Sequence, residues 1–382
     1  MDLTYTQDER MVLDMVHDFA ESDIRPYAAQ WDQEETVPLP VLRKMQELGL
    51  FGLMIPEEYG GAGVSTACYA AVIEEVSRVC AAVAIALSVH NSVGAFPVLR
   101  FGGEEQKRHY LPLLASRWIG AFSLTEPEAG SDAARLRLKA EKLPEGDYLL
   151  NGTKSFVTNG SIADLYLVMG RTAELPEAPH RGVTAFLVER SLPGVSPGKM
   201  EHKTGLRASD TTELVFENCR VPESQRLGAE GQGFKIAMMS LDNGRIGVGA
   251  QATGIAQGAL EEAAAYAQTR RQFDRPIASF QAVQFMLADM QTQIRAARLL
   301  VQNAAWLKDA GEPHGKEAAM AKLFASRMAN RVVHDAVQIH GGYGYTREYA
   351  VERYARDARV TEIYEGTSEM QRLVIARHLL RG

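Results

Sequence analysis

The spacing of apolar residues divides the chain into three stretches of different character. From residue 9 to 19 the apolar positions recur three and four apart, which predicts a helix, and residues 39–50 repeat the pattern. Residues 66–92 are rich in Ala and Val and apolar nearly all round, so we expect them inside a helical bundle. The first 120 residues are therefore predicted to be mostly helical.

Helical spacing is absent from about residue 121 to 226, where short β-rich runs alternate with turn residues. Asn151-Gly152 stands between two such runs and is typical of a two-residue turn, so we predict a β-hairpin within residues 147–159. Further strands are predicted at residues 165–169, 183–188 and 212–216, with Pro193, Pro197 and Pro222 in the connections between them.

Helix returns from about residue 233 to the end of the chain. One long amphipathic helix is predicted from apolar positions spaced alternately four and three apart: Val283, Leu287, Met290, Ile294, Ala297, Val301 and Ala304. A second helix covers residues 316–340 and ends at Gly341-Gly342, and a third begins near Gly366. No strand is followed by a GxGxxG that opens a helix, which argues against a nicotinamide-binding Rossmann unit.

Composition narrows the class of protein. A chain of 382 residues is too long for one ordinary core, so we expect two or three packed units. Its 41 basic and 48 acidic residues give a net charge of −7, which disfavours nonspecific nucleic-acid binding. The three cysteines form no CxxC pair and the nine histidines lack metal-ligand spacing, so we expect neither a disulfide nor a metal site.

Targeting and membrane signals are also missing from the sequence pattern. No apolar run approaches the ~20 residues that span a membrane, so no membrane span is expected. The polar N-terminus lacks the basic-then-apolar order of a signal peptide. We therefore expect a cytoplasmic protein of bacterial type without a transit peptide.

Five segments carry a resemblance to a known family. They are AFSLTEPEAGSD at residues 121–132, TKSFVTN at 153–159, RRQFDRP at 270–276, QIHGGYGY at 338–345 and YEGTSEMQR at 364–372. In this order, over about residues 5–380, they resemble the motifs of acyl-CoA dehydrogenases. The resemblance implies an α+β fold and a homotetramer, a dimer of dimers. Its three domains would be an N-terminal α-helical domain (1–120), a middle β domain of barrel-like or sandwich form (121–230) and a C-terminal four-helix bundle (231–382).

The family's catalytic base matches Glu365. Taken alone, Glu365 would be a surface acid in a turn beside a flexible glycine. The resemblance implies FAD-dependent α,β-dehydrogenation of acyl-CoA to trans-2-enoyl-CoA: Glu365 takes the α-proton and the β-hydrogen leaves as hydride to the flavin. A carboxylate in a site emptied of water has a raised pKa and is a better base. The Glu365 backbone N–H and a flavin hydroxyl would hold the thioester carbonyl, and Gly366 would allow the substrate to approach closely.

The resemblance implies that separate parts of the chain form the FAD site. The residues matching the isoalloxazine site are Phe122, Leu124, Thr125, Ser131, Phe156, Val157 and Thr158, and Thr367 and Glu369 complete it. The adenine end would be held by Arg270, Phe273 and Gln281 of a neighbouring subunit, and the pyrophosphate by backbone groups of Gln338, Ile339, Gly341 and Gly342. Phe156 stands where the family usually has Trp. Taken singly, Phe156 could equally be a core aromatic, Gly341-Gly342 a helix cap and Arg270-Arg271 a solvated basic pair.

The segment SLDNGRIG at residues 240–247 bears on the substrate. By resemblance, Arg245 lies beside the coenzyme A moiety, Asp242 is a nearby polar contact, and Ser131 and Gly366 lie close to the thioester. In isovaleryl and long-chain members of the family, the catalytic base stands at the position that matches Gly244. A glycine has no side chain and cannot act as a base. This segment and residues 362–380 look closest to short-chain (butyryl-CoA) dehydrogenases.

The resemblance also implies a redox partner, electron-transferring flavoprotein. Four alternatives stay open: a branched short-chain dehydrogenase, a medium-chain dehydrogenase, an acyl-CoA oxidase of the same fold, and a flavin-binding scaffold without catalysis. Oxidases of the peroxisomal type have a much longer chain, and the retention of Glu365 speaks against a scaffold.

Overall fold

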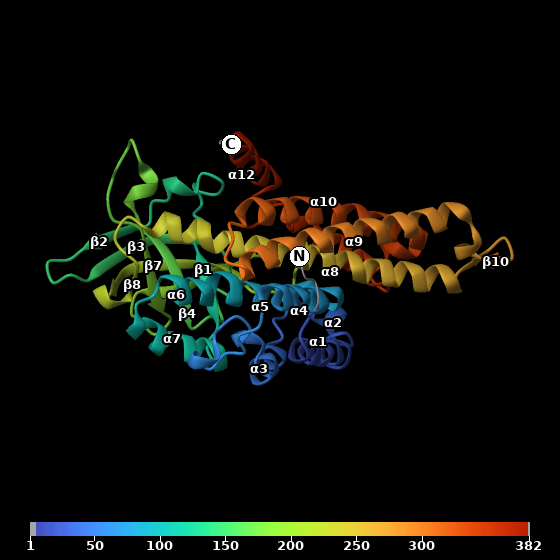
Figure 1. Ribbon diagram of the computed structural model, residues 1–382, viewed down its shortest axis with the longest axis horizontal. Helices are drawn as coiled ribbons and strands as arrows, with labels where there is room; N and C mark the ends of the chain where they lie inside the picture. The colour runs from blue at the N-terminus through green and yellow to red at the C-terminus, as the bar shows by residue number, and fades with distance from the viewer. Residues whose placement is uncertain (1–4, 381–382) are drawn as a thin grey trace.

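The computed structural model describes residues 5–380 and runs from helices through a sheet to helices again (Figure 1). The N-terminal helices are α1 (Gln7–Phe19), α2 (Ala28–Glu34), α3 (Leu39–Glu47), α4 (Thr66–Val79), α5 (Ala81–Val89), α6 (Phe96–Phe101) and α7 (Glu104–Ser116). The C-terminal helices are α8 (Gly233–Thr269), α9 (Gln281–Asp309), α10 (Gly315–His340), α11 (Val351–Val360) and α12 (Ser368–Leu380). The predicted α+β fold, with helical parts on either side of a β part, is confirmed.

The middle of the chain forms one mixed sheet. Its strands are β1 (Gly120–Ser123), β2 (Lys139–Lys142), β3 (Tyr148–Thr158), β4 (Leu165–Arg171), β5 (Val183–Glu189), β6 (Val195–Met200), β7 (Thr211–Val221) and β8 (Arg226–Leu227). They lie in the order β6-β7-β3-β2-β4-β5-β8, and β1 pairs in parallel with β4. β4 and β5 are buried along nearly their whole length, which explains why they read as continuous apolar runs.

The hairpin predicted at Asn151-Gly152 is wrong. Residues 148–158 form the single strand β3, which pairs with β7 through register shifts at Leu150/Gly152 and at Lys154/Val157. Gly152 takes φ +142°, and the Asn151 side chain accepts a hydrogen bond from the Asn218 backbone N–H at 2.7 Å. An Asn-Gly pair can close a hairpin, but in this chain it forms a bulge, because the runs on both sides of it pair with the same strand, β7.

Pro197 was assigned to a connection and lies instead in strand β6. This strand is at the edge of the sheet and is exposed over most of its length. A proline is tolerated at a sheet edge or beside a bulge, and the pairing of β6 with β7 shifts register directly after Pro197.

The membrane expectation needs one correction. Residues 81–101 form a continuous helical segment that is long and apolar enough to cross a membrane by length and composition. However, 89% of its most apolar window is buried inside the protein. It begins after Cys80, whose extended backbone (φ −151°) also splits the predicted 66–92 helix in two. We interpret this segment as a core helix.

The C-terminal helices form an elongated bundle that projects away from the sheet (Figure 1). α8 is packed against α4, α9 and α10, so it is buried on several sides and carries no narrow apolar stripe. The predicted seam of α9 is buried from Met290 to Ala304, but Val283 and Leu287 are only half-buried. At the far end, the strands β9 (Arg271–Gln272) and β10 (Arg275–Pro276) make a small hairpin between α8 and α9.

Candidate active site

Glu365 lies in the short turn between α11 and α12. Its φ is +51° and that of Gly366 is +92°, so two consecutive residues take the left-handed conformation. This conformation is strained for a residue with a side chain and persists only where the surroundings impose it. Such strain is concentrated at functional sites, which agrees with the predicted role of this turn.

The turn directs the Glu365 side chain against helix α8. The residue that it faces is Gly244: a Cβ placed there would overlap a carboxylate oxygen of Glu365 and lie 2.8 Å from its Cδ. Glycine is therefore the residue that leaves room for the Glu365 carboxylate at this level of α8. Position 244, where the family resemblance puts the base of other members, thus lies in contact with Glu365.

The Glu365 carboxylate is desolvated. The residue as a whole is partly exposed, but both carboxylate oxygens are buried and have no hydrogen-bond partner in the described part of the chain. Burial raises the pKa of Glu365 to about 7, and the positive charges of Lys322 and Arg245 oppose that rise. A carboxyl group with this pKa is half-ionised near neutral pH, as a general base requires.

Arg245 and Asp242 lie one turn apart on α8 beside this turn. Arg245 Nη1 donates to Asp242 Oδ1 at 2.5 Å, and its other Nη would lie 3.9 Å from a Cβ at Gly366. Arg245 is 6% exposed, and its Nε has no partner among the described residues. The structure therefore brings Asp242, Arg245, Glu365 and Gly366 close together.

The two segments predicted to hold the flavin ring lie side by side in the sheet region. The backbone N–H of Ser155 donates to Thr125 O at 2.8 Å, and the ammonium of Lys154 donates to Leu124 O at 3.0 Å. Lys154 is wholly buried and pairs with Glu126 at 2.8 Å. A buried ion pair of this kind holds the segment after β1 against β3.

Phe156 stands at the bulge between Lys154 and Val157, with φ +55° and 65% exposure. The alternative that it is a core aromatic is therefore excluded. Thr125 and Thr158 beside it are half-buried. An open aromatic ring flanked by accessible hydroxyl and backbone groups fits a flat, polar heterocycle such as the isoalloxazine ring of FAD. Ser131 is exposed in the loop that follows this segment.

The residues predicted for the adenine end lie elsewhere, at the tip of the bundle. The Arg270 guanidinium stacks over Tyr343 at 5.5 Å, so the end of α8 and the segment after α10 meet. Phe273 is 87% exposed, and Gln281, Gln338, Gly341 and Gly342 are exposed as well, while Ile339 is buried. Thr269 follows Gly244 by 25 residues on α8, which is about 38 Å at the rise of an α-helix. Within one chain the tip cannot reach Glu365.

Thr367 and Glu369 lie at the start of α12. The Thr367 hydroxyl accepts from the Met370 N–H at 3.4 Å, and the exposed Glu369 pairs with Arg372 at 3.1 Å. Both residues thus adjoin the Glu365 turn, but their contacts within the chain are those of a helix start.

Several buried groups around Glu365 escaped prediction. Lys322 on α10 and Gln371 on α12 both donate to the Gly366 carbonyl, and Tyr364 donates to Gln251 on α8. Lys322 left a signal in the sequence, because it stands among alanines on the face of α10 that helical spacing turns toward the core. Gln371 and Gln251 are ordinary polar residues in helical patterns, and nothing in their spacing distinguishes them.

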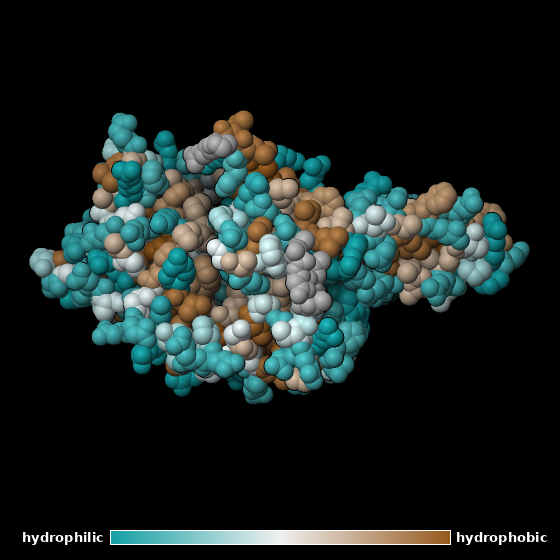
Figure 2. All heavy atoms as spheres, viewed as in Figure 1, coloured by the Kyte–Doolittle hydropathy of each residue, from teal (hydrophilic) through white to brown (hydrophobic). Residues whose placement is uncertain are grey.

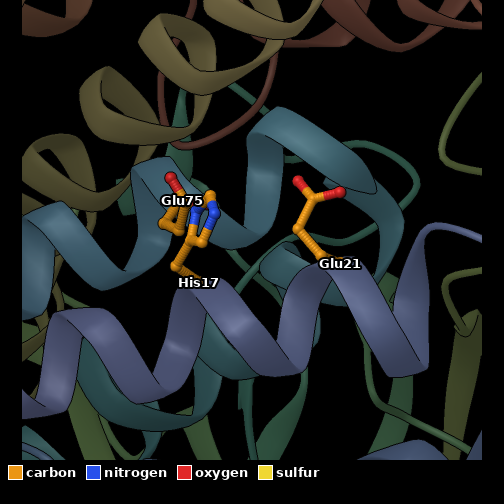
Figure 3. Close-up of side chains that lie close together, drawn as sticks. All are labelled: His17, Glu21 and Glu75. Carbon is orange, nitrogen blue, oxygen red and sulfur yellow. The ribbon is translucent and has the colours of Figure 1, made fainter.

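Away from Glu365, His17, Glu21 and Glu75 come close enough to hold a cation, although their spacing in the sequence does not suggest it (Figure 3). His17 Nδ1 is 2.8 Å from Glu75, and Arg78 forms ion pairs with Glu21 and Glu75. The arginine already neutralises both carboxylates, so we interpret the group as an ion-pair network. A hollow of about 510 Å³ next to it, between α1, α4 and α9, includes His17 and Glu75 and contains no predicted site residue.

Three family models cover almost the whole chain. They are "Acyl-CoA dehydrogenase, N-terminal domain" at residues 6–117, "Acyl-CoA dehydrogenase, middle domain" at 121–219 and "Acyl-CoA dehydrogenase, C-terminal domain" at 231–380. An acyl-CoA dehydrogenase of Bacillus subtilis is 53% identical, with 99% of each chain covered. A short-chain specific acyl-CoA dehydrogenase of Clostridium acetobutylicum is 47% identical, with 100% of each covered.

Solved structures show the same likeness. Butyryl-CoA dehydrogenase from Megasphaera elsdenii superposes with a TM-score of 0.98 at 45% identity, with 100% of both chains covered. A structure described under electron transferring flavoprotein of Acidaminococcus fermentans superposes with a TM-score of 0.97 at 48% identity, again over 100% of both chains.

Burial of Glu365 predicts a pH-dependent cost in stability. Its pKa rises from 4.5 in the unfolded chain to about 7, so between these values only the unfolded chain releases the proton, and stability falls as the pH rises. Glu365→Gln removes this cost. We expect the substitution to stabilise the FAD-loaded protein by about 3 kcal/mol at about pH 8, and by much less at about pH 5.

Chemical denaturation at the two pH values measures this difference. Glu47→Gln, a substitution of an exposed acid on α3, is the control and should leave the pH dependence of stability unchanged. An equal effect of Glu365→Gln at both pH values would contradict a raised pKa.

Proposed function

The chain belongs to the acyl-CoA dehydrogenase family, a family of FAD-dependent oxidoreductases, and we propose that it desaturates short-chain acyl-CoA thioesters between Cα and Cβ. Glu365 is the base in this proposal, and electron-transferring flavoprotein receives the electrons. FAD, when bound, supplies the acceptor for the hydride that leaves Cβ. The first product is the trans-2-enoyl-CoA.

The observation that carries the proposal is the state of the Glu365 carboxylate. It is buried, lacks a hydrogen-bond partner among the described residues and has a pKa of about 7. The α-proton of a thioester is weakly acidic, so its removal needs a fixed base that is ionised at working pH and has affinity for the proton. Both carboxylate oxygens are free to take that proton because no group of residues 5–380 hydrogen-bonds to them.

Positive charge beside the turn serves the same step. Arg245 and Lys322 both act on Glu365 electrostatically and favour its ionised form before the proton is taken. As the α-proton leaves, negative charge develops on the thioester carbonyl. A backbone N–H in this turn, the one assigned to Glu365 by family resemblance, is a suitable donor to that oxygen, and one such donor typically contributes ~3 kcal/mol.

Three features support the short-chain preference. Behind Glu365, the Tyr364 hydroxyl donates to Gln251, which is wholly buried on α8. One turn before Gln251, a Cβ at Gly247 would lie 2.7 Å from the Tyr69 hydroxyl and would overlap Ser88 Oγ. Buried polar groups that satisfy one another are poor neighbours for a long methylene chain. Relatives named for short-chain and butyryl substrates point the same way.

Assembly with a second copy is part of the proposal, because one chain holds the two ends of the FAD site about 38 Å apart along α8. The tip exposes Phe273 at 87% and Phe285 at 63%, which is unusual for large apolar side chains in a monomer. Figure 2 shows further hydrophobic atoms gathered over α12, where Leu379 and Leu380 are 69% and 87% exposed. A homotetramer in which each tip reaches a neighbour's flavin site satisfies both features.

Anaerobic reduction of the flavin by a panel of acyl-CoA lengths tests the function. We expect butyryl-CoA to bleach the flavin faster than octanoyl- or isovaleryl-CoA, and to have the higher kcat/KM in turnover. The bleached enzyme should be reoxidised by electron-transferring flavoprotein but only slowly by air. Glu365→Gln should bind the same ligands and lose ~10²–10⁴-fold in rate. Fast reoxidation by air would identify an oxidase. Absence of bleaching with every acyl-CoA, or a Glu365→Gln variant of parental rate, would contradict the proposal.

The contact between Gly244 and Glu365 gives an independent prediction. Gly244→Ala places a methyl group where the carboxylate lies, so Glu365 must move and kcat for butyryl-CoA should fall by at least ~10²-fold, the cost typical of a base displaced by about 1 Å. Gly103→Ala is the matched control, since a Cβ there meets no atom within 4 Å. Parental activity in Gly244→Ala would refute the geometry.

Assembly through the tip can be tested separately from catalysis. Arg270→Ala removes the cation that stacks on Tyr343 and that we place at a neighbour's FAD, so we expect lower FAD content and a smaller mass by light scattering. Arg108→Ala, an exposed arginine on α7 with only a salt bridge within its helix turn, is the control and should change neither. Unchanged flavin content and mass in Arg270→Ala would rule out this role.

A further inference from the structure

Lys322 is a wholly buried lysine on helix α10, next to the Glu365 turn. Its side chain is 0% exposed, and its ammonium donates to the backbone carbonyl of Gly366. No carboxylate lies within ion-pair distance of it among the described residues. Burying an ammonium without a paired carboxylate costs several kcal/mol, so the position demands an explanation beyond packing.

Lys154, which is also wholly buried, differs from Lys322 in having a carboxylate partner. Lys154 is equally buried, but it has Glu126 at 2.8 Å and so forms an ordinary buried ion pair. For Lys322 the carboxylates that act electrostatically are Glu365, Glu362 and Glu369, with Glu365 the strongest of them. Its pKa is lowered to about 8, chiefly by burial, so the group still carries its charge at neutral pH.

The Gly366 carbonyl is held from two sides. Gln371 Nε2 donates to it at 2.7 Å and to the Glu365 carbonyl at 3.4 Å, while Lys322 donates to Gly366 from α10. These donors fix the peptide that follows two left-handed residues. Such a backbone conformation persists only where the surroundings over-determine it, and here α10 and α12 together supply those bonds.

The groups that face the Glu365 carboxylate identify which cation is free to act on it. Arg245 comes from α8, but it is already paired with Asp242 at 2.5 Å. Tyr69 from α4 and Tyr364 in the turn itself are neutral hydroxyls whose pKa values are raised by burial. Lys322 is thus the cation whose charge is not cancelled by a carboxylate of its own.

We propose that Lys322 is a positioning residue for the dehydrogenation: its ammonium holds the Gly366 carbonyl, and with it the turn that aims Glu365, and presents its charge to the carboxylate. The inference rests on the proposed function, in which Glu365 is the base. The hydrogen bond fixes where the base stands. The charge favours the ionised form, which alone can accept the α-proton, and after the transfer the site holds a neutral Glu365 beside the ammonium.

Three variants of the FAD-loaded enzyme separate the hydrogen bond from the charge. Lys322→Met removes both, Lys322→Gln keeps a donor without the charge, and Gln371→Leu removes the second donor and leaves the charge. Lys308→Met is the matched control, because Lys308 is also desolvated, with a pKa of about 8, but is not among the charges that act on Glu365. Each variant is assayed with butyryl-CoA across pH, together with its FAD content.

In Lys322→Met we expect kcat to fall at least ~10-fold with KM within about threefold, since the base is misaligned while coenzyme A contacts remain. Loss of the positive charge raises the pKa of Glu365, so the acidic limb of the kcat/KM profile should move up by about one pH unit. Lys322→Gln should show the same shift with a smaller loss of kcat. Gln371→Leu should lose kcat without the shift, and Lys308→Met should change neither.

A readout that needs no turnover accompanies the kinetics. The stabilisation by Glu365→Gln grows with pH and levels off at the pKa of the folded Glu365, and in a Lys322→Met background this levelling-off should occur about one pH unit higher. An unmoved limb and an unmoved levelling-off pH in Lys322→Met would overturn the inference, whatever the rate. So would an equal shift in Lys308→Met. If Lys322→Met does not retain FAD, Lys322→Gln decides the charge by the same criteria.

Failure of this inference is distinct from failure of the proposed function. If the parental enzyme reduces its flavin with butyryl-CoA and Glu365→Gln does not, the function stands. A Lys322→Met enzyme with the parental profile then removes only the role of Lys322. If the parental enzyme reacts with no acyl-CoA, the pH at which the stabilisation by Glu365→Gln levels off still measures whether Lys322 acts on Glu365.

Discussion

The close contact between the Glu365 carboxylate and the backbone of α8 at Gly244 is the constraint on which the site depends. A carboxylate can sit against a helix only where the helix has no side chain, and the Cβ of any other residue would overlap it. Once placed there it is cut off from water, which raises its pKa to about 7 and makes nearby cations necessary. The left-handed turn, the buried Lys322 and the two hydrogen bonds to the Gly366 carbonyl all serve to hold a charged group in this position.

Much of this arrangement could be predicted from the sequence, and the residues show why the rest could not. Helical spacing located α9 and α10, because burial of one helix face leaves a periodic pattern of apolar residues. Continuous apolar runs located β4 and β5, because these strands are buried on both faces. The bulge at Asn151-Gly152 was misread, since a turn dipeptide does not reveal whether its flanking runs pair with each other or with a third strand. Tertiary pairing decides that question.

The same division holds at the site. Motifs named Glu365 and Arg245, but a motif records residues that touch ligands and omits those that hold the ligand-touching residues in place. Lys322 and Gln371 act on the Gly366 carbonyl from helices that are separate in sequence, so only the folded chain reveals that they converge. The motifs likewise do not reveal that about 38 Å of α8 separates the level of Glu365 from the tip. That distance is the reason for proposing that a second copy completes the cofactor site.

The site also sets two requirements against each other. An ionised carboxylate and an ammonium without a carboxylate of its own are both unfavourable to bury, and each lowers the stability of the fold that contains it. The surrounding structure can tolerate this because α4, α8 and α10 are long and closely packed helices whose apolar burial does not depend on these two residues. Replacing either by an apolar residue would therefore be expected to strengthen the fold and, if Glu365 is the base as proposed, to disable it. That opposition, in which function resides in the least stable groups of a well-packed bundle, is the physical reason to treat Lys322 as part of the reaction machinery and not as part of the core.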